Sequence, residues 1–206
     1  LAPGYAPLSF TAPEPGSYAL PAMGSAADGA VIDSNGNSAQ LYDFLGGKPT
    51  VLSFIFTTCD DVNGFPLATY VMRSVQDALQ ADPVTADKAR LVSFSFDPVF
   101  DTPDVIDAYG SQFRAGDFDW QFLTTEGAAA LDPILNAYGQ WVIRDYDEND
   151  KYMGTMSHIL RVFLIDESRQ IRNIYSTSFL HADTVANDVR SLLMEAEAGP
   201  ASEAES

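Results

Sequence analysis

A single cysteine is the most reactive side chain in this sequence of 206 residues. Cys59 follows a nearly continuous apolar stretch, residues 50–56, and precedes apolar residues at helical spacing, so we expect it in a loop between a buried strand and a helix. The positive end of that helix favours a reactive thiolate, whereas the carboxylates of Asp60 and Asp61 oppose it. These carboxylates are equally suited to capping the helix, and an inert buried thiol is the simplest alternative for Cys59. Because there is no second cysteine, the chain forms no internal disulfide.

Histidine is the other residue type suited to chemistry near neutral pH, and the sequence has two. His158 precedes an apolar stretch, and taken alone it fits a buried histidine that is hydrogen-bonded to the backbone. His181 lies beside Asp183 at the start of the last expected helix, where we expect a surface or capping residue. Met153 and Met156 lie close to His158 and are expected to fill gaps in the core or in a loop.

The predicted secondary structure around these residues alternates between strands and helices. We expect strands over residues 30–33, 50–56, 89–96, 118–123, 159–165 and 170–175, and helices over 41–45, 67–79, 101–113, 128–138 and 185–193, with a short apolar stretch at 141–143. The Asn35-Gly36 pair predicts a hairpin-type turn after the first strand. The pattern predicts an α/β fold of the thioredoxin-like three-layer type, in which helices flank a central mixed sheet. Reactive sites of such sheets lie beyond the carboxyl ends of the strands, where Cys59 is expected.

Composition divides the chain into three parts. Residues 1–27 are rich in proline and are expected to be extended, as a strap over the domain or as a linker. Residues 28–195 form the expected thioredoxin-like domain, and residues 196–206 an acidic tail that we expect to be disordered. No stretch of about 18 apolar residues is present, so we expect membrane attachment only through an anchor outside this sequence.

The net charge of the chain limits the kinds of molecule that it can bind. Eleven Lys and Arg against 29 Asp and Glu give 11 − 29 = −18. A field of this sign repels nucleic acid and anionic lipid surfaces, so we do not expect nucleic acid as a partner. A metal cation, a basic protein surface or simple solubility are all compatible with it.

Several segments of the sequence resemble the motifs of the Sco/SenC family. Residues 56–63, Phe-Thr-Thr-Cys-Asp-Asp-Val-Asn, are similar to its aromatic-Thr-x-Cys-Pro-Asp-Val-Cys motif. Residues 95–103 resemble its Ser-x-Asp-Pro-x-x-Asp-Thr-Pro, residues 137–139 its Ala-Tyr-Gly, and residues 157–166 its histidine followed by a strand that ends in Leu-Ile-Asp. The resemblance covers about residues 28 to 195, and several motifs in the same order are far more specific than any one of them.

The resemblance implies a copper-binding metallochaperone. Members of the family bind copper through two cysteines and a histidine, deliver it to the dinuclear copper site of cytochrome oxidase, or reduce the cysteines of that site. Carried over to this chain, the first thiol is Cys59 and the imidazole is His158, whereas Asn63 occupies the position of the second cysteine. Since dithiol–disulfide exchange needs two thiols, the resemblance does not extend to an internal reductase role.

The substitution at residue 63 alters the expected metal site. An amide oxygen is a poor ligand for soft Cu(I), so the change should weaken binding of Cu(I) more than binding of Cu(II), and zinc is also compatible with the site. A carboxylate oxygen of Asp60 or Asp61 would complete a mixed site. The thioether of Met156 is the other candidate, because it precedes His158 by two residues and would share its face of an extended segment. The expected metal residues are therefore Cys59, His158, Asp61, Asn63 and Met156.

Two alternatives stay open beside the metallochaperone. One is a one-cysteine thiol peroxidase, for which Thr57-Thr58-Cys59 is a loose likeness and which would need an arginine near the thiol, from Arg73, Arg144 or Arg161. The other is an assembly module that has lost metal binding. The family resemblance implies a periplasmic or other extracytoplasmic protein, commonly tethered, with a cytochrome oxidase subunit or another copper protein as partner. A single thiol there is exposed to intermolecular pairing, so a dimer linked through Cys59 is the first oligomer to check.

Overall fold

A mixed sheet of eight strands forms the centre of the computed structural model, which describes residues 8, 10–58, 65–149 and 152–199. The strands run across the sheet in the order β1 (Gly24–Ser25), β10 (Gln170–Tyr175), β9 (Val162–Ile165), β4 (Thr50–Ile55), β5 (Arg90–Ser95), β6 (Trp120–Thr124), β2 (Ala30–Asp33) and β3 (Ser38–Gln40). Strands β4, β5 and β6 are parallel, and the flanking strands are antiparallel to their neighbours. The expected α/β fold with a mixed sheet flanked by helices is confirmed.

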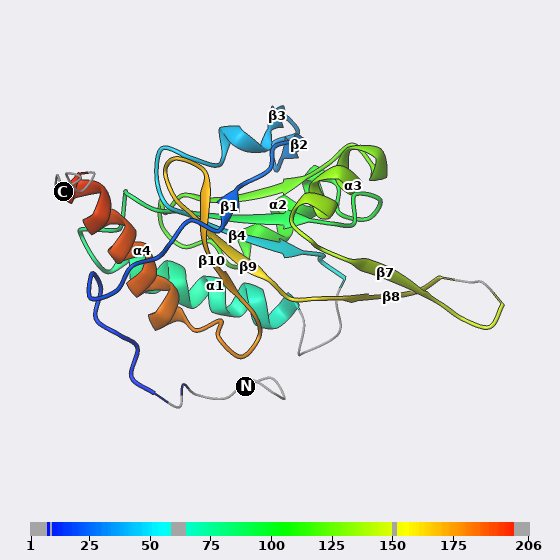
Figure 1. The fold of residues 1–206 in the computed structure, drawn as a ribbon. Coiled ribbons are helices and arrows are strands. Elements are labelled where there is room, and N and C mark those ends of the chain that lie inside the picture. Colours follow the sequence, from blue (N-terminus) through cyan, green and yellow to red (C-terminus); the bar gives the residue numbers. More distant parts are fainter. Residues whose placement is uncertain (1–7, 9, 59–64, 150–151, 200–206) are drawn as a thin grey trace.

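Helices cover both faces of this sheet. Figure 1 shows α1 (Phe65–Gln80) and α4 (Ala182–Ala198) on one side and α3 (Ala128–Ala137) on the other. Helix α2 (Pro103–Ser111) packs beside α1, where the Tyr109 hydroxyl donates to Thr69 Oγ1 at 2.9 Å. All six residues of β4 are buried, as expected for an apolar strand that is covered on both faces. A single 3₁₀ turn, η1 (Leu41–Asp43), replaces the short helix expected over residues 41–45. Gly46 and Gly47 follow it with positive φ angles, which a helix cannot continue through.

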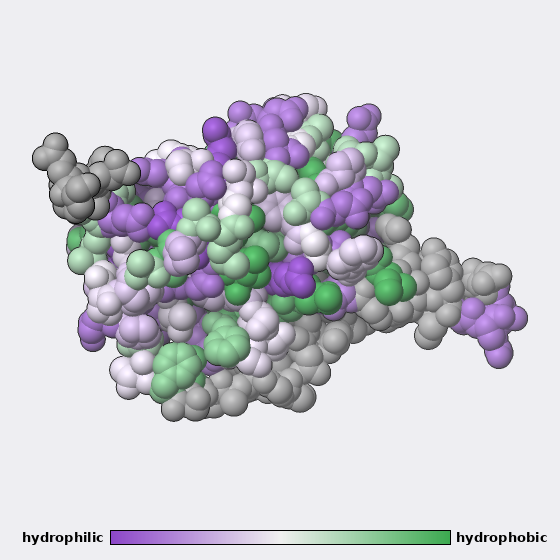
Figure 2. Space-filling view, in the orientation of Figure 1, coloured by the Kyte–Doolittle hydropathy of each residue, from purple (hydrophilic) through white to green (hydrophobic). Residues whose placement is uncertain are grey.

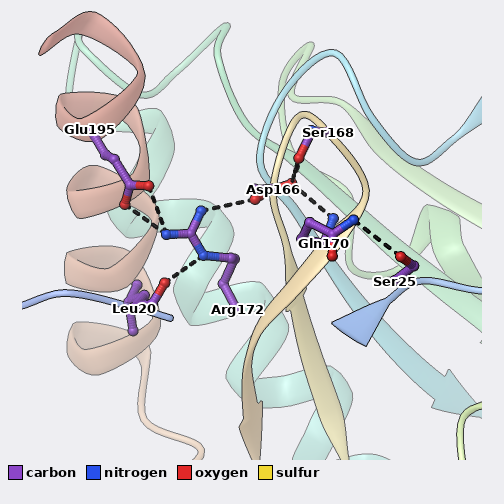
Figure 3. A network of polar contacts seen from close by, with 7 residues as sticks. All are labelled: Leu20, Ser25, Asp166, Ser168, Gln170, Arg172 and Glu195. Atoms are coloured by element: carbon purple, nitrogen blue, oxygen red, sulfur yellow. Dashed lines mark hydrogen bonds and ion pairs between the residues drawn. The ribbon is translucent and has the colours of Figure 1, made fainter. Parts of the chain in front are cut away.

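Part of the proline-rich N-terminal segment lies against β10 and α4. Arg172 holds it in place, since its Nε donates to the Leu20 carbonyl at 2.5 Å and its two other nitrogens pair with Asp166 and Glu195 (Figure 3). The Tyr18 hydroxyl donates to Asp188, which also accepts a hydrogen bond from the Tyr175 hydroxyl at 2.6 Å. At the other end of the chain, α4 continues to Ala198, three residues beyond the boundary expected at 195, and residues 200–206 of the expected tail lie outside the described residues.

A two-stranded antiparallel ribbon extends from the body of the domain. It consists of β7 (Val142–Tyr146) and β8 (Tyr152–His158), and Figure 1 shows it projecting away from the central sheet. The sequence pattern indicated only its first residues, 141–143, and assigned the residues after 158 to a strand. That strand begins instead at Val162, because residues 159–161 connect the ribbon to the sheet.

Candidate functional site

The site lies where β4 and β5 end at the same edge of the sheet. Parallel register aligns these two strands, so the aromatic residues that follow them, Phe56 and Phe96, pack together with ring centroids 5.1 Å apart. Both rings are buried. The chain continues from Phe56 through Thr57 and Thr58 to Cys59, and the predicted ligands Cys59, Asp61 and Asn63, with Asp60, lie outside the described residues.

His158 is placed at this edge by the ribbon. It is the last residue of β8 and lies opposite Val142 of β7. Its imidazole contacts both aromatic rings, with centroid distances of 6.1 Å to Phe56 and 5.6 Å to Phe96. The side chain is half-buried, and its ring packs against Phe56 and Phe96. The structure therefore brings the predicted histidine to the end of the strand that leads to Cys59.

The buried carboxylate of Asp101 accepts hydrogen bonds from Thr57, in the loop that contains Cys59. Asp101 is 1% exposed and accepts hydrogen bonds from the Thr57 backbone N–H at 3.1 Å, from the Thr57 hydroxyl, and from the Ser95 hydroxyl at 2.5 Å. Burial raises the pKa of Asp101 above its ordinary value, while the hydrogen bonds from Ser95 and Thr57 act in the opposite direction. Asp101 thus ties the end of β5 to the start of the loop after β4.

Sequence reasoning did not assign Asp101 a role, although the motif at residues 95–103 contains both Ser95 and Asp101. A serine at the end of a buried strand, followed by two aspartates within six residues, was the signal that could have identified it. Asp97, from the same motif, is also 1% exposed.

Met156 lies on the same face of β8 as His158, because the two residues are two positions apart in an extended strand. Its side chain is 7% exposed and belongs to the hydrophobic core. His181 is the N-cap residue of α4, and its side chain makes no capping hydrogen bond there.

Two arginines that a thiol peroxidase could use hold backbone carbonyls instead. Arg73 donates to the Phe113 carbonyl at 2.8 Å and pairs with Asp77, and Arg161 donates to the Gly139 carbonyl at 3.0 Å. The side chain of Arg144 lies outside the described residues. Within the part of the chain that the structure describes, no three His, Cys, Asp or Glu side chains cluster closely enough to hold a metal ion, and the acids next to Cys59 are not in that part.

Comparison with known proteins decides the family. The model of the SCO1/SenC family matches residues 27–194, which is most of the chain. This chain belongs to the SCO1/SenC family. The expected family membership is thereby confirmed.

Relatives of the SCO1/SenC chain are distant in sequence. The SCO1 protein homolog of Bacillus subtilis (strain 168) is 21% identical over 159 residues, which cover 77% of this chain and 78% of the relative. The crystal structure of Arabidopsis thaliana ScoI with copper bound has a TM-score of 0.69 at 18% identity and covers 82% of this chain and 98% of that one. A SCO1/SenC family lipoprotein from Bacillus anthracis str. Ames has a TM-score of 0.67 at 22% identity and covers 82% and 95% of the two chains. These likenesses show that the fold is shared. No helix among the described residues is long and apolar enough to cross a bilayer.

Proposed function

We propose that this protein binds a copper ion as cargo and passes it to another copper protein. The Cys59 thiolate and the His158 imidazole are the two principal ligands in this proposal. The observation that carries it is the contact of His158 with Phe56, because Phe56 precedes Cys59 by only three residues. Membership in the SCO1/SenC family and the likeness to an Arabidopsis relative that has copper bound support the same role.

The reach of the chain is compatible with a shared ion. Three residues span at most about 11 Å even when fully extended, so the Cys59 backbone is covalently restricted to the neighbourhood of Phe56. The Phe56 ring is itself in contact with the imidazole. A thiolate and an imidazole are ligands that suit both copper and zinc, and the apolar wall formed by Phe56 and Phe96 would keep water from one side of the site.

Asp101 would support the cysteine ligand from behind. By holding both the backbone N–H and the hydroxyl of Thr57, it fixes the chain two residues before Cys59. A ligand on a fixed loop loses less conformational freedom when the metal binds, which increases affinity. Asp101 is therefore a positioning residue in this proposal, and it does not contact the ion.

The third ligand in this proposal differs from the second cysteine that the family resemblance implies. Asn63 occupies the position of the second cysteine, and Asp61, Asn63 and Met156 are the candidates in this chain. Met156 would have to leave its packed position to reach an ion, since its side chain is 7% exposed. An oxygen from Asp61 or Asn63 would shift the preference of the site from Cu(I) toward Cu(II) or zinc.

The partner and location follow from the same role. A cytochrome oxidase subunit or another copper protein would receive the ion, and the protein would work outside the cytoplasm. The Bacillus anthracis relative described as a lipoprotein supports an outward-facing location. An internal dithiol–disulfide cycle is not part of the proposal, because Cys59 is the only cysteine in the sequence.

Metal titration of the purified protein tests this function. We expect about one copper ion per chain, and we expect Cys59→Ser and His158→Ala each to abolish this binding. His181→Ala is the matched control, because it removes the only other histidine from the start of α4 and should leave binding unchanged. Equal copper binding by the wild type and by both ligand variants would overturn the proposal.

A further inference from the structure

The ribbon of β7 and β8 has two different faces. Its register pairs Val142 with His158 and Ile143 with Ser157. Since neighbouring residues of a strand point to opposite faces, Val142 and His158 share one face, and Ile143 points to the other. The first face is the one that joins the candidate site.

Large apolar side chains are exposed on this second face and at the residues that flank the two strands. Trp141 is 69% exposed, Ile143 65% and Ile159 48%, whereas Met156 on the first face is 7% exposed. We call Trp141, Ile143 and Ile159 the apolar face of the ribbon. Figure 2 shows apolar surface where the ribbon leaves the body of the domain. Apolar side chains gathered in this way on one face of a projecting element are typical of a protein-binding surface.

The ribbon also offers a free strand edge. In the described part of the chain, β7 pairs with β8 alone, so the backbone groups along its other edge have no strand partner. A hollow of about 270 Å³ lies between α3 and the start of β7, lined among others by Asp132, Asn136, Gln140 and Trp141. Gln140 is 6% exposed, and its amide Nε2 has no hydrogen-bond partner among the described residues. An extended peptide can satisfy such an edge by adding a strand.

The charge of the hollow and of the ribbon indicates what kind of peptide would bind to the edge of β7. The residues that line the hollow include Asp132 and no lysine or arginine. Residues 141–159 contain two basic and four acidic side chains, so their net charge is 2 − 4 = −2, and the whole chain carries −18. Two copies of this chain would repel each other, whereas a basic segment would be attracted.

We propose that the free edge of β7 and the apolar face of the ribbon bind an extended, positively charged segment of a partner protein by strand addition. Apolar residues at alternate positions of that segment would lie beside Trp141 and Ile143. Lysines or arginines between them would face the acidic surroundings. This surface lies on the same two strands as His158 and requires no bound metal.

The fluorescence of Trp141 gives a direct test with metal-free protein. The other tryptophan, Trp120, is 1% exposed and lies in the core, so a change in emission on peptide addition reports on Trp141. The probe is the blocked hexapeptide acetyl-Lys-Ile-Lys-Ile-Lys-Ile-amide. We expect a saturable blue shift with a dissociation constant below about 1 mM. The same peptide with alternate backbone nitrogens methylated cannot pair along a strand edge, and we expect it to bind at least about tenfold more weakly.

Two protein variants complete the test. Ile143→Lys should weaken binding of the hexapeptide by about tenfold or more, because it places a like charge on the apolar face. Ile174→Lys, which changes an isoleucine of β10 that is 37% exposed, is the matched control and should bind the peptide as the wild type does. Equal affinity for the methylated peptide, unchanged affinity of Ile143→Lys, or no saturable shift would overturn the proposal. Self-association through the ribbon, detected by sedimentation and abolished by Ile143→Lys, would overturn it in favour of a second copy.

Discussion

The imidazole of His158 packs edge-to-face on the ring of Phe56, with the centroids 6.1 Å apart and the ring planes at 78°. This contact joins the ribbon to the end of β4, and through it the histidine lies beside the segment that leads to Cys59. The proposed site is formed by this contact, by the hydrogen bonds from Thr57 to Asp101, and by the side chain at residue 63.

Phe56→Leu tests the contact itself. Leucine keeps most of the buried apolar volume but removes the ring, so we expect the free energy of unfolding to fall by only about 1–2 kcal/mol. We also expect weaker copper binding, because the imidazole loses the surface that orients it. Chemical denaturation and copper titration of the same variant measure both effects. A variant with unchanged copper affinity and the expected loss of stability would show that the ring has no role in placing the histidine.

Asp101→Ala tests the fastening of the loop. It removes the acceptor of three hydrogen bonds and leaves the Thr57 and Ser95 donors unpaired, so we expect a loss of about 2–3 kcal/mol in the free energy of unfolding. Copper affinity should fall as well, and by more than in any equally destabilised variant remote from the site. Asp104→Ala, which changes an exposed aspartate in the first turn of α2, is the control and should alter stability by less than about 0.5 kcal/mol.

Tyr18→Phe tests how the N-terminal segment is held. Burial and the hydrogen bond to Asp188 raise the pKa of Tyr18 to about 12, above its ordinary value of 10.0. A raised pKa means that the hydroxyl stabilises the folded protein fully below pH 10.0 and loses this contribution as the pH rises toward about 12. We expect Tyr18→Phe to lower the free energy of unfolding by about 1 kcal/mol at neutral pH and to show a smaller further loss between these two pH values.

Tyr70→Phe provides the control for this measurement. Tyr70 is 61% exposed on α1, so removal of its hydroxyl should leave the free energy of unfolding unchanged. Denaturant titrations of both variants at several pH values make the comparison. Identical behaviour of the two variants would show that Tyr18 does not fasten the segment.

Asn63→Cys tests the proposed effect of residue 63 on which copper ion the site prefers. A second thiolate near Cys59 suits Cu(I), so we expect the affinity for Cu(I) to rise by at least about tenfold, with a smaller change for Cu(II). Competition with a Cu(I) chelator under reducing conditions measures it. The matched variant Asn63→Ser removes the amide without supplying a thiol and should not raise the affinity for Cu(I).

Most of the sheet could be predicted from the sequence. Strands β4 and β5 are apolar, β-branched and aromatic runs typical of a strand buried on both faces, and the turn after β2 carried a clear Asn-Gly signal. The ribbon of β7 and β8 could not be predicted in the same way. Its residues mix charged, polar and apolar side chains without a sheet to bury either strand, so the pattern has no clear period.

The side-chain contacts of the site could not be predicted from the sequence. Sequence motifs selected His158 and the segment around Asp101, but not what these side chains touch. The approach of His158 to Phe56 and of Asp101 to Thr57 results from packing between segments that are distant in the chain. Local pattern carries no information on such pairs.

X-ray absorption spectroscopy at the copper edge of the loaded protein identifies the atoms bound to the ion and so tests whether Cys59 and His158 share it. We expect one sulfur and at least one imidazole nitrogen around the same copper, with the sulfur lost in Cys59→Ser and the imidazole scattering lost in His158→Ala. A spectrum with oxygen and nitrogen neighbours alone, unaltered by either substitution, would contradict this expectation.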